Sequence, residues 1–217
     1  AIDIKRYLLK RRIKEKEEEL EKVVKLRKNQ RQGRSKTLPT VAIVGYTNAG
    51  KSTLMNHFIR KTENVRKDEI LQENRLFATL STNTRYVKID GYYPFLLTDT
   101  VGFISHLPHS LIKAFRSTLE EIKEADLLVH VVDISHPDFE EQISVVDKTV
   151  ADLGAGGKPT MIVFNKIDAY TYIEKAEDDL TPKTKENTTL EELMRTWMAK
   201  LNDNCIFISA REKINMD

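Results

Sequence analysis

Cysteine is almost absent from this 217-residue chain, which carries only Cys205. A single cysteine excludes a disulfide framework within the chain and suits a reducing compartment. Long apolar runs are also lacking, since no stretch approaches the roughly 18 consecutive apolar residues that a membrane span needs. The first residues are too charged for a signal peptide. With 40% hydrophobic and 31% charged residues, the composition is globular, and we expect a soluble, cytoplasmic protein without a membrane span.

The net charge of +2 hides an uneven distribution. Residues 1–38 hold 14 Lys and Arg against 6 Asp and Glu, whereas residues 39–217 hold 21 against 27. A basic arm on a mildly acidic body is typical of proteins that contact polyanions. A solvated helix whose charges maintain solubility explains the same pattern equally well, so charge alone does not separate the two interpretations.

A long helix is predicted at the start of the chain. Residues 3–32 lack glycine and proline and are rich in Lys, Arg, Glu and Leu, and a helix of this length spans roughly 45 Å. Its apolar stripe is narrow, so we expect it to need a partner, as in a coiled-coil hairpin. The chain is therefore divided into a helical segment with its linker, residues 1–36, and a second domain, residues 37–217.

From residue 39 onward, short apolar runs alternate with segments of helical periodicity. This pattern is typical of an α/β fold, in which a mostly parallel sheet lies between two layers of helices. The expected strands are 41–44, 86–89, 94–98, 127–132, 161–164 and 205–208, and the expected helices are 51–59, 111–124, 139–153 and 190–201. Asp90-Gly91 is a tight-turn pair between the second and third strands. Residues 169–189 are polar and aperiodic, which predicts a loop.

Residues 45–52, with the sequence GYTNAGKS, match the pattern G-x-x-x-x-G-K-[ST] between a buried strand and a helix. In such a loop, glycines let backbone N–H groups surround phosphate oxygens, and the helix N-terminus adds partial positive charge. Lys51 then places a cation on the β and γ phosphates, and the Ser52 hydroxyl can ligate Mg²⁺. The expected nucleotide contacts here are Gly45, Tyr46, Thr47, Asn48, Ala49, Gly50, Lys51, Ser52 and Thr53.

A D-x-x-G sequence follows the expected strand 94–98 and consists of Asp99, Thr100, Val101 and Gly102. A carboxylate at a strand end, about fifty residues after the phosphate loop, is well placed to hold Mg²⁺ through water. Gly102 can offer its N–H to the γ-phosphate where a side chain would obstruct approach. The pattern is weak by itself, and its value comes from its position.

Residues 165–168 have the sequence NKID, follow the expected strand 161–164 and predict the choice of base. A carboxylate at Asp168 accepts from both N1–H and the N2 amine of guanine, whereas adenine presents an acceptor at N1 and no amine. Residues 209–211, after the last strand, can direct a backbone N–H at guanine O6. The residues expected at the base are Asn165, Lys166, Ile167, Asp168, Ser209, Ala210 and Arg211. The order of the motifs favours GTP over ATP.

With these motifs the chain resembles GTPases of the translation-factor-related class and, within that class, the HflX family of ribosome-associated GTPases. The resemblance covers about residues 5–215 and is carried by 45–54 (GYTNAGKSTL), 76–80 (LFATL), 99–104 (DTVGFI), 115–121 and 133–137 (DISHP). It implies a P-loop GTPase that binds GTP and GDP with Mg²⁺ and hydrolyses GTP to GDP and phosphate. It also implies the large ribosomal subunit as partner and a function in rescuing or splitting stalled ribosomes.

The resemblance also implies functions for residues that spacing alone leaves open. Thr79 is implied to be the switch threonine whose hydroxyl joins Ser52 on Mg²⁺ in the GTP state. The family usually has an aspartate where this chain has Ser81, a departure that leaves Thr79 unaffected. Implied nucleotide contacts are Phe77, Ala78, Thr79, Leu80 and Ser81. The implied Mg²⁺ ligands are Ser52, Thr79 and Asp99, and the implied catalytic residues are Lys51, Thr79 and Gly102.

Phe103 stands where Ras-like proteins place the glutamine that orients the attacking water. A phenyl ring can neither donate nor accept a hydrogen bond in that role, so intrinsic hydrolysis is expected to be slow. A partner, or the substrate's own phosphate with backbone N–H groups, is then expected to position the water. The family shares this apolar substitution. Relative to the family, we expect the chain to be a fragment without the N-terminal domain and without the closing helix of the G domain.

Three functions stay open at this point. The first is a monomeric GTPase that switches on the large ribosomal subunit. The second is a GTP-gated binding module in which Phe103 makes hydrolysis negligible. The third is an RNA-binding protein whose basic helix contacts the RNA backbone by charge and shape, with a vestigial nucleotide site. GTP turnover with and without ribosomal subunits separates the first from the second.

Overall fold

The computed structural model describes residues 11–12, 14–15, 18, 38–62, 83–100, 102–103, 120–175, 182 and 184–216. The chain divides into two compact units, Ala1–Leu38 and Pro39–Asp217. In the first unit the described residues 11–12, 14–15 and 18 are helical, and the Arg11 and Glu15 side chains form an ion pair at 3.0 Å. That pair has the i, i+4 spacing at which helical side chains meet. The full helix over 3–32 and its separate function remain predictions.

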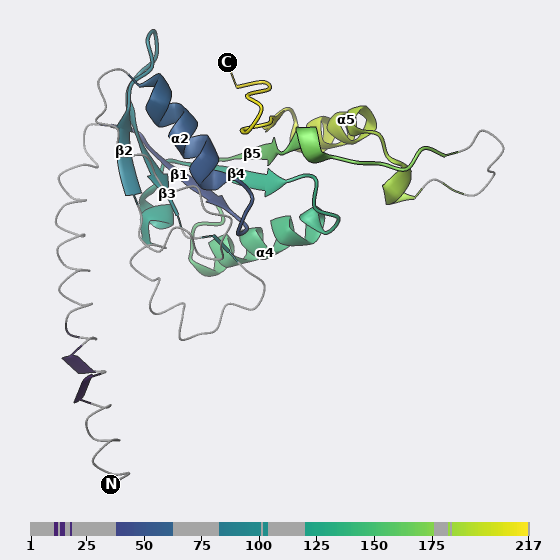
Figure 1. Ribbon diagram of the computed structural model, residues 1–217. Helices are drawn as coiled ribbons and strands as arrows, with labels where there is room; N and C mark the ends of the chain where they lie inside the picture. The colour runs from purple at the N-terminus through teal and green to yellow at the C-terminus, as the bar shows by residue number, and fades with distance from the viewer. Residues whose placement is uncertain are drawn as a thin grey trace. The chain divides into compact units, whose positions relative to one another are not determined.

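The second unit contains a six-stranded sheet with the order β2-β3-β1-β4-β5-β6 (Figure 1). The strands are β1 (Thr40–Gly45), β2 (Asn83–Val87), β3 (Phe95–Asp99), β4 (Leu127–Asp133), β5 (Thr160–Asn165) and β6 (Cys205–Phe207). The β2–β3 pair is antiparallel, and the other four pairs are parallel. The predicted mostly parallel sheet is confirmed, and each expected strand is present.

The strand order places a topological switch point at the end of β1. The chain leaves β1, returns on one side as β3, and later crosses to the other side as β4. The crossover elements leave a crevice beside the carboxyl ends of strands at such a point, and open α/β sheets bind ligands there. The phosphate loop, Asp99 and Asn165 each follow or end one of these parallel strands, so the topology brings the predicted motifs to one edge.

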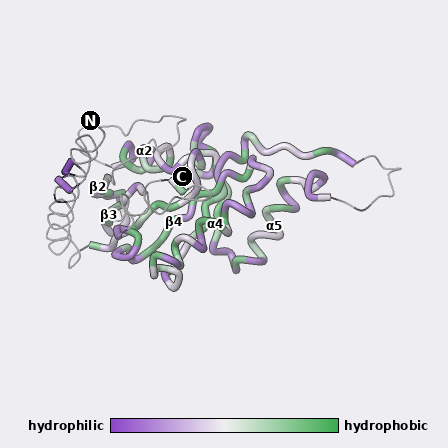
Figure 2. The backbone as a smooth tube through the Cα atoms, turned by 90° about the horizontal axis from the view of Figure 1, so that it is seen from below, coloured by the Kyte–Doolittle hydropathy of each residue, from purple (hydrophilic) through white to green (hydrophobic). Residues whose placement is uncertain are grey.

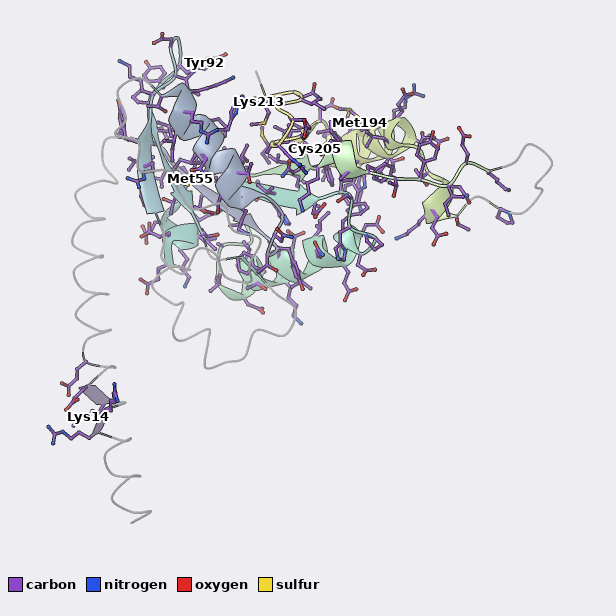
Figure 3. The ribbon with its side chains drawn as sticks, in the orientation of Figure 1. Lys14, Met55, Tyr92, Met194, Cys205 and Lys213 are labelled. Carbon is purple, nitrogen blue, oxygen red and sulfur yellow. The ribbon has the colours of Figure 1, made fainter. Side chains whose placement is uncertain are left out.

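Helices cover both faces of the sheet (Figure 1). α2 (Lys51–Lys61) buries Leu54, Met55 and Ile59 in a cluster that includes Ile43 of β1. Figure 3 shows Met55 on α2, where it lies on the side of the helix nearest the strands. On the opposite face, α4 (Phe139–Asp152) contributes Val146 to a cluster with strand residues. Figure 2 shows hydrophobic residues along β4. The predicted three-layer sandwich is therefore confirmed.

An aromatic cluster packs α5 (Leu190–Leu201) against β5 and β6, at one end of the sheet. The rings of Phe164 and Phe207 stack with centroids 4.6 Å apart, and Trp197 of α5 lies 5.1 Å from Phe164. Offset stacked and tilted rings are favourable arrangements for aromatic pairs. Trp197 is buried, and Cys205 is buried as a free thiol in the same cluster. Trp197 therefore acts as the core anchor of α5.

The strand boundaries differ from the sequence expectations mainly at β2. The strand was expected at 86–89 but occupies Asn83–Val87, because antiparallel pairing with β3 runs from Asn83 opposite Asp99 to Val87 opposite Phe95. The Asp90-Gly91 turn is present, with Gly91 at φ 81°. Of the helix expected at 111–124, residues 120–124 are helical and the rest lie outside the described residues.

The segment expected as a loop at 169–189 contains more structure than its composition indicates. Short 3₁₀ turns occupy Ile167–Ala169 and Lys185–Asn187. The base of the loop is closed by the Tyr170 hydroxyl, which donates to the Thr188 carbonyl at 2.8 Å. Single turns leave no apolar periodicity in a sequence, so the pattern could not reveal them.

None of the helices that the structure describes is both long enough and apolar enough to cross a membrane.

Candidate nucleotide site

The phosphate loop follows β1 and contains backbone conformations with positive φ, which few residue types adopt readily. Gly45 has φ 150°, Asn48 has φ 63° and Gly50 has φ 98°. A Cβ at Gly45 would lie 2.2 Å from the Val131 carbonyl oxygen, and a Cβ at Gly50 would lie 2.2 Å from the Asn165 Nδ2 atom. Both glycines of the sequence pattern are therefore required by close approach to β4 and β5 as well as by backbone conformation.

Lys51 is a buried cation at the centre of this loop. Its Nζ donates to the Tyr46 carbonyl oxygen at 2.8 Å, and its exposed fraction is only 7%. Burial lowers the pKa of the Lys51 ammonium from 10.5 to about 8, although nearby Asp99 opposes this shift. A buried cation is destabilised unless an anion compensates it. The loop therefore holds a positive charge that a phosphate group would stabilise.

Ser52 and Asp99 form the candidate Mg²⁺ position. The Ser52 hydroxyl donates to Asp99 Oδ2 at 2.8 Å, and Asp99 is fully buried at the end of β3. The next residue, Thr100, donates its hydroxyl to the Ile43 carbonyl oxygen at 2.6 Å and fixes the turn after the strand. Magnesium in nucleotide sites prefers hard oxygen ligands, with one or two from protein and the rest from phosphates and water. The Ser52 and Asp99 oxygens fit that requirement.

Gly102 lies directly against the phosphate loop. A Cβ at this position would lie 2.8 Å from Thr47 Cγ2 and 3.0 Å from Lys51 Nζ, so a side chain has no room. The neighbouring Phe103 pairs with the loop, since its N–H donates to the Gly45 carbonyl at 3.1 Å. The Phe103 ring is buried in the apolar cluster under α4. The ring therefore points into the core and away from the phosphate loop.

Asn165 connects the phosphate loop with the loop after β6. Its Nδ2 donates to the Ala49 carbonyl at 2.9 Å, and its Oδ1 accepts from the Ala210 N–H at 2.9 Å. The buried amide of Asn165 therefore binds two protein loops, and its expected contact with the base stays a prediction. Ser209 serves the same loop, because its hydroxyl accepts from the Glu212 N–H at 3.0 Å. Asn165 thus links the phosphate loop to the loop that contains Ser209 and Ala210.

The base-reading segment follows β5. Asp168 lies in the exposed 3₁₀ turn Ile167–Ala169, and Lys166 has a left-handed conformation with φ 67°. Lys166 Nζ donates to Asp133 Oδ2 at 2.6 Å. Sequence reasoning missed Asp133 as a functional candidate. The sequence contains a pattern that could have indicated it, because Asp133 and Ser135 form a D-x-S sequence at the end of a buried strand. From such a position a side chain can reach the end of the neighbouring strand.

The structure describes most of the predicted site residues and brings them to the carboxyl edge of the sheet. Tyr46, Thr47, Asn48 and Ala49 form the loop, and Thr53 lies in the first turn of α2. Some predicted positions lie outside the described residues, namely Phe77, Ala78, Thr79, Leu80, Ser81 and Val101. The proposed switch threonine and its coordination of Mg²⁺ therefore remain predictions.

The sequence model of one protein family, described as "50S ribosome-binding GTPase", matches residues 40–166. That stretch is more than half of the chain and runs from β1 to Lys166. The chain belongs to this family of 50S ribosome-binding GTPases.

Two bacterial members of this GTPase family illustrate how much of the chain is shared. A "GTPase HflX" from Flavobacterium psychrophilum is 47% identical over 218 residues, covering 100% of this chain and 51% of the relative. A "GTPase HflX" from Caldanaerobacter subterraneus subsp. tengcongensis is 42% identical over 217 residues, covering 100% of this chain and 43% of the relative. The resemblance to HflX proteins is confirmed, and the chain spans about half the length of these relatives.

One solved structure is similar to this chain in its fold. The GTP-binding protein from the hyperthermophilic archaeon Sulfolobus solfataricus, in complex with GDP, aligns with a TM-score of 0.58 and 26% identity. The alignment covers 95% of this chain and 54% of the archaeal chain. The likeness supports a P-loop GTPase fold in the second unit.

Proposed function

We propose that this chain is the GTP-binding and GTP-hydrolysing part of a ribosome-associated GTPase of the HflX type. The observation that carries the proposal is the buried Lys51, which is enclosed by the phosphate loop and lies beside Gly102. A cation with a pKa lowered to about 8 by burial is stabilised when phosphate enters the loop. Membership of a GTPase family supports the same chemistry.

Guanine selection is assigned to the turn after β5 and the loop after β6. The Asp168 carboxylate is exposed at the sheet edge, so it is open to the N1–H and N2 amine of guanine. The Ala210 N–H donates to Asn165 and the Glu212 N–H donates to Ser209. We assign the contact with guanine O6 to the Arg211 N–H, which lies between those two donors in the chain.

The proposed reaction is in-line attack of water on the γ-phosphorus of GTP, which breaks its bond to the β–γ bridging oxygen and leaves GDP and phosphate. Lys51 and the N–H groups of the phosphate loop stabilise the charge that develops on the bridging and γ oxygens. Ser52, Thr79 and Asp99 would hold Mg²⁺, which would further neutralise the phosphate charge. Gly102 offers its N–H to the γ-phosphate.

Hydrolysis by the isolated chain is expected to be slow. The Phe103 ring is buried among Ala42, Val44 and other apolar side chains, so it supplies no group that orients water. A partner that completes the site would raise the rate, and the large ribosomal subunit is the partner that the family description suggests. This assignment implies a cytoplasmic location and a nucleotide-dependent function in rescuing or splitting stalled ribosomes.

The decisive experiment measures nucleotide choice and turnover separately. In a competition titration, Mg²⁺-GDP should displace a fluorescent guanine nucleotide at concentrations at which Mg²⁺-ADP does not. Turnover of GTP should then rise when large ribosomal subunits are added. Equal affinity for GDP and ADP would overturn the guanine assignment, and an unchanged rate would overturn the ribosomal activation.

A second function, a GTP-gated binding module without hydrolysis, is favoured by the same burial of Phe103. Its test is single-turnover release of phosphate from GTP. No release, either alone or with large subunits, would favour this second function. A third function, RNA binding by the basic helix, predicts that deletion of residues 1–34 flattens the salt dependence of RNA binding. An unchanged salt slope would exclude that helix as the main RNA contact.

A further inference from the structure

A carboxylate at the end of β4 is held by three hydrogen bonds. Asp133 Oδ1 accepts from the backbone N–H of Ser135 at 3.1 Å and from the Ser135 hydroxyl at 2.6 Å. Asp133 Oδ2 accepts from Lys166 Nζ at 2.6 Å. The two bonds from Ser135 fix the rotation of the carboxyl group, so Oδ2 faces Lys166. Charge-assisted bonds of this length are the stronger class of hydrogen bond.

Lys166 occupies a backbone conformation that is unfavourable for a residue with a side chain. Its φ of 67° places it in the left-handed region. Such a conformation costs of order 1 kcal/mol for a non-glycine residue and persists only where surrounding contacts impose it. Lys166 also stands directly between Asn165, which joins two loops, and the 3₁₀ turn with Asp168. The conformation of Lys166 therefore sets the direction in which the Asp168 turn leaves β5.

The ion pair is sheltered from solvent. The exposed fraction of the side chain is 14% for Asp133 and 30% for Lys166. Salt and water screen such a pair less than a surface pair. The strand ends are also locked side by side, because Asp133 is the register partner of Asn165 and the Ile134 N–H donates to the Asn165 carbonyl at 3.1 Å. The position of Asp133 is therefore fixed relative to Lys166 and the turn that follows β5.

We propose that Asp133, oriented by Ser135, is a positioning residue for guanine recognition. It holds Lys166, and through Lys166 the turn with Asp168, in the conformation that receives the base. The proposal rests on the proposed function, since it assigns the end of β4 to the guanine site. Asp133 itself is given no contact with the nucleotide. Its contribution should therefore vanish when Lys166 loses its ammonium group.

A structural function alone would give a different result. If the pair only stabilised the sheet edge, its loss would weaken binding of any ligand in the phosphate loop to a similar extent. A positioning function predicts a loss confined to ligands that carry the base. Inorganic tripolyphosphate with Mg²⁺ fills the phosphate loop and has no base, so it serves as the discriminating probe.

The test substitutes Asp133→Asn, which keeps the shape and the acceptor toward Ser135 but removes the charge. We expect the Kd for Mg²⁺-GDP to rise about fivefold to tenfold, mainly through faster dissociation. The Kd for Mg²⁺-tripolyphosphate should stay within about twofold. Asp138→Asn is the matched control, because Asp138 is an exposed acid five residues along the same connection and its side chain forms no cap bond to α4. The control should change neither Kd.

Two further variants separate positioning from simple damage. In a Lys166→Met background, Asp133→Asn should add less than about twofold to the Kd for GDP, since the residue acts through the ammonium group. Ser135→Ala should weaken GDP binding by about twofold to threefold, and Ser135→Thr should restore it. An equal loss of tripolyphosphate binding, or the full Asp133→Asn effect in the Lys166→Met background, would overturn the proposal. A wild-type chain without preference for GDP over ADP would instead refute the guanine site.

Discussion

The backbone N–H of Thr47 donates to the carbonyl oxygen of Phe103 at 2.8 Å, so the phosphate loop and the segment after β3 share a short parallel pairing. The Phe103 ring lies in the core below this pairing. A single side chain thus anchors the backbone that places Gly102 beside Lys51. The backbone of Phe103 pairs with the phosphate loop, and its buried ring holds that backbone in the core.

Substitution of Phe103 by glutamine tests this anchoring function. Glutamine would supply the group that orients water in other GTPases, but here the side chain enters an apolar cluster. We expect no gain in GTP hydrolysis and a loss of about 3 kcal/mol in the free energy of unfolding. Denaturant unfolding and single-turnover phosphate release measure the two quantities. Phe103→Leu is the control and should cost only about 1 kcal/mol. A faster Phe103→Gln enzyme would contradict the assigned orientation.

A methyl group at position 102 should weaken the binding of GTP more than the binding of GDP. Its Cβ would lie 2.8 Å from Thr47 Cγ2 and 2.9 Å from the Thr47 Cα atom, so the segment must move away from the loop. Gly102→Ala should weaken a non-hydrolysable GTP analogue at least about tenfold and weaken GDP much less, because only the γ-phosphate needs the N–H of Gly102. Isothermal titration of both nucleotides measures the ratio. Gly157→Ala, at an open position, is the control. An unchanged ratio would place the γ-phosphate contact elsewhere.

The motifs of the site were visible in the sequence because each is a local pattern with a local cause. The phosphate loop requires glycines at Gly45 and Gly50, and both requirements are found in the backbone. The register of β2 was not visible, because it depends on antiparallel pairing with β3 and not on periodicity. Burial of the Phe103 ring likewise depends on the residues that surround it, and a sequence does not display them.

The function of Asn165 shows the limit of motif reading most clearly. The sequence predicts a contact with the base, but it does not reveal that the Asn165 amide joins Ala49 and Ala210, which lie 116 and 45 residues away in the chain. These contacts form because the parallel strands bring their carboxyl ends to one edge of the sheet. The ion pair between Asp133 and Lys166 has the same origin, since Asp133 ends β4 and Lys166 follows the neighbouring strand β5.

Asp168 offers the most direct test of base recognition. Replacement by asparagine turns a double acceptor into a group with one acceptor and one donor, which matches the N1–H and the C2 carbonyl of xanthine. We expect Asp168→Asn to lose at least about tenfold in affinity for GDP and to bind xanthosine diphosphate more tightly than GDP. Because the side chain is exposed, the free energy of unfolding should change by less than about 0.5 kcal/mol. A variant that still prefers GDP would contradict the placement of this carboxylate.

Lys51 should impose a stability cost that depends on pH. Its pKa is about 8 in the folded chain and 10.5 in the unfolded chain, so the unfolded state binds more protons between these values. Stability therefore rises with pH across this interval, and below pH 8 the buried charge costs about 3 kcal/mol. Lys51→Met removes the titrating group. At pH 7 the free energy of unfolding of Lys51→Met should exceed that of the wild type. We expect this difference to fall by about 1 kcal/mol between pH 7 and pH 9.

Nucleotide binding provides the control for this prediction. Phosphate oxygens stabilise the ammonium form, so Mg²⁺-GDP should remove the pH dependence of the wild type and leave Lys51→Met unaffected. At pH 8, where about half of the Lys51 side chains are neutral, binding should also take up roughly half a proton per nucleotide. Calorimetry in buffers of different ionisation enthalpy measures this uptake. An equal proton uptake by the wild type and Lys51→Met at pH 8 would show that burial does not lower the pKa of Lys51. The buried ammonium group would then not be the source of the affinity for phosphate.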